Sequence, residues 1–402
     1  MKKLLGIVVL GLLFFLVTSQ GISKDKFPGC KIPKKPKEKI IEAPEAVLKK
    51  QKTPTTRLEK VLAKRKTINV FRAWNKEYGT ERYGLYWTKA PDPPGPSNLS
   101  LMEVYWNYHL PNVRIANYPG IEKFLIKKDW KGKGHGTGGE YGKTIWVDFF
   151  HPDFAEYFAN LVFKLAKSHR AKCPLIRHDN CYKDGKIIPI SQTKILIDGI
   201  ILDWWHNEQP GASENKVKKA RKKIAEAIRN KMGKEFIILA NVNWFGDGDT
   251  HDLINGVFME LYKTKKTSSA YSCNEIAKIE KLIKFHDQNL LEPRIIAVNT
   301  WRITKKFSSK YNKWEKMELF LKDRSSPENI QFAKLFTAMA MVIPENGYIL
   351  YGDNNPDRLD GDHHHTYYDF YNTDFGKAIS DMVEITKGVA YKKHEKGLIA
   401  YN

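Results

Sequence analysis

Two acidic residues, Asp203 and Glu260, each follow a short apolar run that contains no other charge, residues 200–202 and 257–259. A carboxyl group at the end of such a strand loses solvent on one side, which suits a carboxylic acid to donate a proton. Glycoside hydrolysis usually needs two carboxyl groups. One protonates the leaving oxygen, and the other attacks the anomeric carbon or activates water. We therefore predict that Asp203 and Glu260 form a catalytic pair.

Further polar and aromatic residues stand near the ends of predicted strands, where they could bind a sugar. Aromatic rings offer flat apolar faces to the C–H faces of sugars, and polar groups bond to the hydroxyls. The predicted substrate-binding residues are Arg72, Trp74, Asp148, Trp205, Asn241, Trp244, Tyr262, Trp301 and Asp353. Some of the aromatic rings must pack in the core, because the adjacent Trp204 and Trp205 cannot point the same way on an extended strand. Two alternatives stay open for the carboxylates: each could pair with an arginine, or Asp148 could be the functional acid.

Short apolar and β-branched runs alternate with longer helical stretches from Thr67 onward. Strands that are apolar on both faces and joined by helical crossovers predict an α/β fold with a parallel sheet. Eight such runs favour a closed (β/α)8 barrel, the TIM barrel, over residues 67–402, with its active site at the carboxyl ends of the strands. The expected strands are residues 68–74, 113–117, 144–149, 198–204, 235–241, 254–260, 294–299 and 347–352. The expected helices are residues 153–171, 214–232, 274–289, 327–341 and 374–385.

The segments 198–205 (DGIILDWW) and 255–260 (NGVFME) resemble the fourth- and sixth-strand motifs of the hypothetical glycoside-hydrolase-like family 15. That family is similar to the endo-α-1,4-polygalactosaminidases of glycoside hydrolase family 114. Residues 146–148, 367–370 and 375–377 agree with it too, and residues 393–402 resemble the hairpin that ends such barrels. The resemblance implies that Asp203 and Glu260 are catalytic. It also favours retention of configuration, with Glu260 as nucleophile and Asp203 as acid/base.

The amino-terminal 66 residues differ in composition from the rest of the chain. Residues 1–21 have the pattern of a signal peptide: two lysines, an apolar run and then small residues. An uncleaved membrane anchor is the alternative, and either way we expect a periplasmic or secreted protein. Residues 22–66 are rich in lysine and proline, which predicts a solvated linker. We therefore expect residues 67–402 to fold and act without residues 1–66, and we expect no appended carbohydrate-binding domain.

The formal net charge of +22 does not by itself predict nucleic-acid binding, because residues 24–66 hold 15 Lys or Arg against 5 Asp or Glu. We predict an oligo- or polysaccharide substrate, no nucleic-acid partner, membrane contact only through an uncleaved amino-terminal segment, and a monomer.

We expect no cofactor and no metal. The alternative for the run His363-His364-His365 is a metal- or substrate-contacting loop. Cys173 and Cys181 are predicted to form a disulfide in an oxidising compartment. The main functional alternative is a non-catalytic carbohydrate-binding barrel that keeps the cleft and has lost the chemistry.

Overall fold

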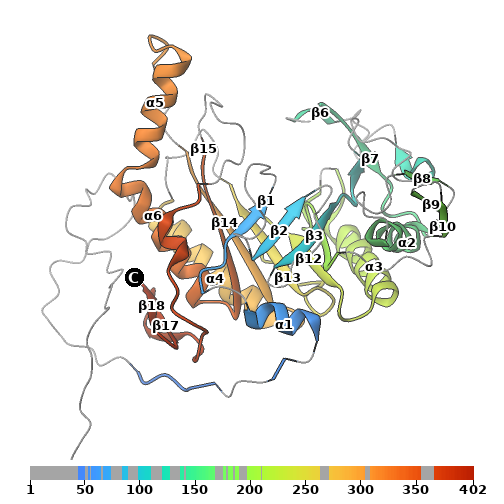
Figure 1. Ribbon diagram of the computed structural model, residues 1–402. Coiled ribbons are helices and arrows are strands. Elements are labelled where there is room, and N and C mark those ends of the chain that lie inside the picture. The colour runs from blue at the N-terminus through green and yellow to red at the C-terminus, as the bar shows by residue number, and fades with distance from the viewer. Residues whose placement is uncertain are drawn as a thin grey trace, which may run out of the picture.

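The computed structural model centres on an eight-stranded parallel sheet with the strand order β1-β2-β3-β11-β12-β13-β14-β15 (Figure 1). The structure describes residues 44–49, 53–54, 56–64, 67–73, 84–88, 98–109, 120–126, 136–139, 142–167, 175–177, 180–183, 186–189, 197–209, 211–262, 271–303, 308–354 and 366–402. The strands of the sheet are β1 Phe71–Ala73, β2 Leu85–Thr88, β3 Leu99–Val104, β11 Gly199–Leu202, β12 Ile237–Asn241, β13 Gly256–Leu261, β14 Ile295–Ile303 and β15 Asn346–Asn354.

The two edges of this sheet come together. Val70, just before β1, forms a parallel bridge with Ile349 of β15, and the Ile349 amide donates to the Asn69 carbonyl at 2.9 Å. The chain is therefore an α/β fold whose parallel sheet is consistent with a partial (β/α)8 barrel.

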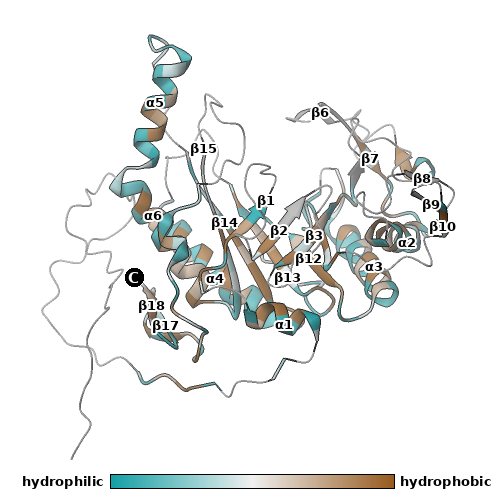
Figure 2. Cartoon of the chain, in the orientation of Figure 1, coloured by the Kyte–Doolittle hydropathy of each residue, from teal (hydrophilic) through white to brown (hydrophobic). Residues whose placement is uncertain are grey.

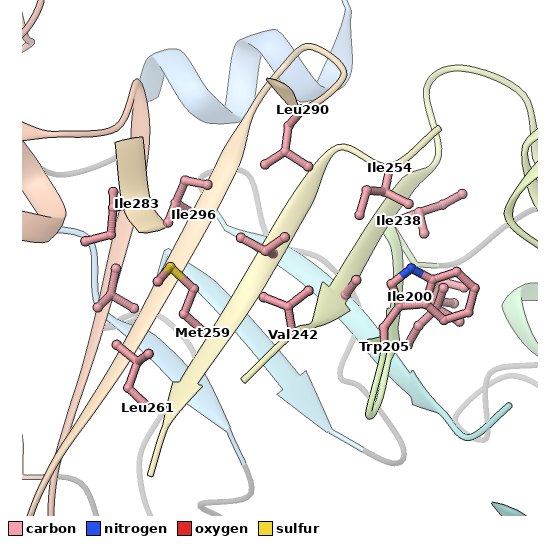
Figure 3. Close-up of a cluster of buried hydrophobic side chains, with 14 of the residues drawn as sticks. Ile200, Trp205, Ile238, Val242, Ile254, Met259, Leu261, Ile283, Leu290 and Ile296 are labelled. Carbon is pink, nitrogen blue, oxygen red and sulfur yellow. The ribbon is translucent and has the colours of Figure 1, made fainter. Parts of the chain in front are cut away.

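Side chains of the sheet alternate between an inner and an outer apolar cluster, as the two-residue period of a strand requires. The inner cluster includes Phe71, Leu101, Ile201, Leu239 and Phe258. The outer cluster packs against the helices, and Figure 3 shows part of it around β11 to β14. Gly199 lets β11 approach β12 closely, because a Cβ there would lie 2.2 Å from the Ile237 carbonyl oxygen.

Besides α1 Arg57–Lys64, the described residues form the helices α2 Phe154–Lys167, α3 Glu214–Met232, α4 Cys273–Asn289, α5 Lys313–Arg324 and α6 Pro327–Val342. Helix α4 begins with a capping box, in which Ser272 and Glu275 satisfy each other's backbone amides. Helix α3 ends at Gly233, whose φ of +80° favours glycine. In Figure 2 α3 carries both hydropathy colours, since one face is buried and the other is exposed.

Helix α5 was not expected. Residues 374–385 were expected to be helical, and this is wrong, because part of them forms β16 Val383–Thr386.

Three smaller antiparallel sheets flank the central one. The first contains β4 Tyr108–His109, β5 Leu125–Ile126, β6 Gly136–Gly139 and β7 Gly142–Val147, and the second contains β8 Leu175–Arg177, β9 Asn180–Lys183 and β10 Lys186–Pro189. The third consists of β16, β17 Val389–His394 and β18 Gly397–Tyr401, so the expected closing hairpin is present. Two 3-10 helices are formed by Ile121–Phe124 and Asp369–Asn372.

The prediction that residues 144–149 form the third strand of the barrel was wrong. The segment 144–149 falls largely in β7, which pairs antiparallel with β4 and β5 outside the central sheet. Strands β2 and β3 take the second and third places instead. Residues 113–117 lie outside the described residues. An apolar run of this length predicts a strand but not the sheet that it joins, which explains the error.

Part of the expected linker is folded against the barrel. Residues Arg57–Lys64 form helix α1, which lies across one end of the sheet (Figure 1). Leu58 and Val61 are 6% and 2% exposed and belong to the inner apolar cluster, and Arg57 pairs with Asp198 at 2.9 Å. The signal segment lies outside the described residues. Among the helices that the structure describes, none combines the length and apolarity of a membrane span.

Candidate active site

The two predicted catalytic carboxylates share one hydrogen-bond donor. Asn241, the last residue of β12, is fully buried, and its Nδ2 donates to Asp203 Oδ1 at 2.9 Å and to Glu260 Oε2 at 2.8 Å. The Asp203 Oδ1 also accepts the Trp204 amide at 3.0 Å. Asp203 is 7% exposed, and Glu260 is half-buried. The structure thus brings Asp203, Asn241 and Glu260 together at the carboxyl ends of β11, β12 and β13.

Strand alternation explains why these residues meet. On each strand they stand two positions after a residue of the inner apolar cluster, which is Ile201, Leu239 or Phe258. The inner layer of the barrel therefore changes from apolar to polar at one level. The same step places Glu103, two residues after Leu101, and Asn299, two after Ala297, in this polar layer.

Glu103 was missed by the sequence reasoning because β3 was not recognised. It is 5% exposed, and its Oε1 accepts the Tyr105 hydroxyl at 2.5 Å. The available signal was the alternation in Leu99-Ser100-Leu101-Met102-Glu103, whose odd positions face the interior. A third carboxylate therefore stands on the strand next to β11, since Ile201 pairs with Glu103.

Trp204, and not Trp205, is the exposed tryptophan after Asp203. Its φ of 53° lies in the left-handed region, so the chain turns sharply after Asp203 and leaves the indole 42% exposed. Such a conformation in a bulky residue is uncommon and is concentrated at functional sites. Asn243 repeats it after β12 with a φ of 50°.

Trp205 is a core residue, so its prediction as a substrate-binding residue is wrong. It is fully buried, its Nε1 donates to Thr250 Oγ1 at 2.9 Å, and its ring packs against Trp106 at 4.9 Å. The Arg221 guanidinium lies 5.0 Å from the same ring. A ring enclosed on these sides cannot stack on a sugar.

The other predicted aromatic residues group at the ends of β13 and β14. Tyr262 is 43% exposed, and its ring centre lies 6.4 Å from that of Trp301. The Trp244 Nε1 donates to the Tyr262 carbonyl at 3.1 Å, and the Trp301 amide donates to the buried Tyr271 hydroxyl at 2.7 Å. Tyr271 in turn donates to the Leu261 carbonyl at 2.5 Å. These contacts hold three partly exposed rings, Trp244, Tyr262 and Trp301, beside the strand that carries Glu260.

Of the remaining predicted residues, Arg72 and Asp148 are not brought to the carboxylate pair. Arg72 is 7% exposed and stands between Phe71 and Ala73, which face the interior, so alternation puts Arg72 on the outer face of β1. Asp148 follows β7 in the flanking sheet, so its predicted place at the end of a barrel strand is wrong. Asp353 lies in β15, opposite Arg302, and its side chain is not described. Trp74 lies outside the described residues.

A network of buried polar groups fixes the loop that leaves β11. Trp106 Nε1 donates to the Asp203 carbonyl at 2.8 Å, and Asn107 Nδ2 donates to Gln209 Oε1 at 2.6 Å. Arg221, 1% exposed, donates to Asn207 Oδ1 at 2.6 Å and pairs with Asp247. The position of Asp203 is therefore set by packed side chains.

Three histidines are buried near this loop. Burial and the nearby Arg221 lower the pKa of His206 to about 4, and its ring stacks on Phe245 at 4.3 Å. His251 Nε2 and His286 Nδ1 lie 2.8 Å apart. Burial lowers the pKa of both, that of His286 to about 3 with the help of His251. All three rings are therefore neutral at pH 7.

No cluster of three or more His, Cys, Asp or Glu that could hold a metal occurs in the part of the chain that the structure describes. The loop with His363, His364 and His365 lies outside it, so the expectation of no metal there remains a prediction. Cys273 is disulfide-bonded, and its partner sulfur belongs to a side chain that is not described. The predicted pairing of Cys173 with Cys181 therefore also stays a prediction.

No known protein family and no curated protein matches the sequence. Solved structures with a similar arrangement include the glycoside hydrolase domain of PelA from Pseudomonas aeruginosa, with a TM-score of 0.38 and 11% identity over 72% of this chain and 95% of that one. An alpha-galactosidase from Thermus thermophilus has a TM-score of 0.37 and 10% identity over 73% and 58% of the two chains. A Paenibacillus cycloisomaltooligosaccharide glucanotransferase has a TM-score of 0.37 and 6% identity over 58% and 38%. Similarity at this level concerns the fold and says nothing about the reaction of this chain.

Proposed function

We propose that this protein is a glycoside hydrolase that cleaves an oligo- or polysaccharide with Asp203 and Glu260. The observation that carries the proposal is the Asn241 amide that bonds to both carboxylates, at 2.9 and 2.8 Å. Because both bonds start at the same nitrogen, the two acceptor oxygens can be no farther apart than the sum of the two bond lengths. That sum is shorter than the distance of about 6.5–9.5 Å between the carboxyl groups of inverting enzymes. The geometry therefore favours the retaining mechanism, in which carboxyl groups about 5–5.5 Å apart flank the scissile bond.

The hydrogen bonds also favour a division of roles. Asp203 Oδ1 accepts two N–H groups, from Trp204 and Asn241, and such bonds stabilise the charged carboxylate that a nucleophile must present. We therefore assign Asp203 as nucleophile and Glu260 as acid/base, the reverse of the roles that the resemblance implied. Asp203 would bond to the anomeric carbon while Glu260 gives its proton to the leaving oxygen. Glu260 would then take a proton from water, whose oxygen displaces Asp203.

The test is a panel of polysaccharides with the wild-type protein, Asp203→Asn and Glu260→Gln, followed by the anomeric form of the first product. Each variant should lower turnover by several orders of magnitude and leave binding nearly intact, since little volume changes. Asp252→Asn, an exposed carboxylate elsewhere, is the matched control. Wild-type turnover in both site variants would reject the pair. Binding without turnover in the wild type would identify a non-catalytic carbohydrate-binding barrel.

Azide separates the two roles. With an activated glycoside, azide should restore turnover in the Glu260→Gln variant and give a product of retained configuration, because the glycosyl-enzyme still forms on Asp203. In the Asp203→Asn variant azide should give the inverted product. The opposite pattern would return the nucleophile role to Glu260.

A further inference from the structure

A pocket of about 610 Å³ lies between the turn that follows β7 and the first turns of α3, in the region where α2 and α3 pack side by side (Figure 1). One wall is formed by residues 148–152, and the other by residues 211–213 with the adjoining face of α3. This second wall belongs to the connection that begins at Asp203. The pocket therefore lies on the side of the barrel to which the carboxyl end of β11 leads.

Lys216, Lys219 and Lys223 line the pocket from one face of α3, as their spacing of three and four residues requires. Among the described residues none of these three ammonium groups has a carboxylate partner. Two neighbouring cations on the helix do have carboxylate partners: Lys218 pairs with Asp249, and Arg221 pairs with Asp247.

One carboxylate, that of Asp148, lines the same pocket, and its Oδ1 accepts the Phe150 amide at 3.1 Å. Three ammonium groups against a single carboxylate leave the pocket positive. A positive, concave site raises the local concentration of an anionic ligand.

The opposite wall adds a donor and an apolar surface. His151 Nδ1 accepts the Asp153 amide at 3.2 Å, so the ring hydrogen lies on Nε2, which offers a further N–H donor. The half-buried Phe150, with Ala155 of α2, adds an apolar surface, and Ala212 and Ala220 add another on the wall that carries the lysines. A pyranose ring with an acidic substituent matches this combination of an apolar wall and cationic donors.

Hydrogen bonds connect the pocket walls to the catalytic candidates. Trp106 donates to the Asp203 carbonyl, and the next residue, Asn107, bonds to Gln209 at 2.6 Å in the loop that leads to α3. The Asn107 carbonyl also accepts the amide of Val147, the residue before Asp148, at 3.1 Å. Both walls are thus fixed to the strand ends that carry Asp203.

We propose that this pocket is a subsite for a negatively charged sugar unit, so that the substrate is an acidic polysaccharide. The proposal rests on the proposed function only in that the ligand is a polysaccharide. A polymer of amino sugars, which carries positive charge, would be repelled by the three lysines.

Calorimetry on the Glu260→Gln protein tests this without turnover. The probes are oligosaccharides of equal length: a galacturonate, a sulfated galactan, a neutral galactan and a glucosamine polymer. We expect an anionic probe to bind at least about tenfold more tightly than the neutral one, with an affinity that falls as salt is raised. The carboxylated and sulfated probes identify which acidic group is preferred.

The triple variant Lys216→Gln/Lys219→Gln/Lys223→Gln should lose this preference. The matched control Lys222→Gln/Lys234→Gln/Lys281→Gln removes the same charge from exposed positions outside the pocket and should keep it. An equal loss in both triple variants would overturn the proposal. So would binding of the neutral or glucosamine probe to the Glu260→Gln protein, with its pocket lysines intact, as tight as that of the anionic probes. Since binding is measured and not hydrolysis, these outcomes stand apart from the test of the catalytic pair.

Discussion

Asn241 is the residue on which the proposed pair depends most directly, because its one amide group bonds to both carboxyl groups. We predict that Asn241→Ala lowers turnover by roughly ten- to a hundredfold, since hydrogen bonds to charged groups are worth about 1.5–3 kcal/mol. The acidic limb of the pH profile should also move to higher pH, because the lost donor favoured the ionised forms. Asn289→Ala, at the exposed end of α4, is the control. An unchanged pH profile in Asn241→Ala would argue against the shared-donor role.

Trp204 and Trp205 offer a matched pair at adjacent positions. Trp205→Ala should lower the free energy of unfolding by about 3–5 kcal/mol, as large-to-small changes in a packed core do. Trp204→Ala should change stability little and should weaken binding of an accepted substrate, because its indole is exposed beside Asp203. Denaturant unfolding and calorimetry of both variants provide the comparison. If Trp204→Ala left affinity unchanged, Trp204 would not be a sugar-binding platform.

Among the elements, helix α1 changes the expectation for the amino-terminal region. Leu58 and Val61 join the inner apolar cluster, so α1 covers one end of the barrel. We predict that deletion of residues 1–66 lowers the midpoint of thermal unfolding, and that Leu58→Ala costs about 2–5 kcal/mol. Lys60→Ala, exposed on the same helix, should be neutral. A deletion variant as stable as the full chain would restore the view of this segment as a linker.

The success of the sequence reasoning differs from element to element for physical reasons. Strands β11 to β15 and helices α3, α4 and α6 were predicted from their apolar runs and helical periods. Strands β2 and β3 were not, and β7 was placed in the wrong sheet, because a run of four to six residues does not encode its pairing partner.

The candidate site followed the same division. Asp203, Asn241 and Glu260 were predicted because each ends a strand that was assigned correctly. Glu103 was missed, and Asp148 was misplaced, because their strands were not assigned correctly. Trp205 was predicted to bind substrate because the left-handed backbone conformation of Trp204 cannot be recognised from the residue types. That conformation leaves Trp204 exposed and Trp205 buried.

For the molecule as a whole, three neutral histidines couple stability to pH. His206, His251 and His286 lie on the loops and helix that join β11 to β14, and the pKa of each is lowered by burial from the ordinary 6.5. Below pH 6.5 these histidines bind protons in the unfolded chain but stay neutral in the folded chain until the pH falls to their lowered pKa. Stability therefore rises with pH in this range and falls on acidification. For His206, whose pKa falls to about 4, the loss approaches ~3 kcal/mol near pH 4, at about 1.36 kcal/mol for each pKa unit.

We therefore predict that the free energy of unfolding decreases steadily between pH 7 and pH 4, and that His206→Phe flattens this decrease. A phenylalanine ring keeps the stacking on Phe245 and cannot bind a proton. The half-buried His151, outside this group, supplies the control His151→Phe. Denaturant unfolding at several pH values measures the slope for each protein. If His206→Phe and the wild-type protein lost stability equally on acidification, protonation of the buried His206 imidazole would not cause the loss.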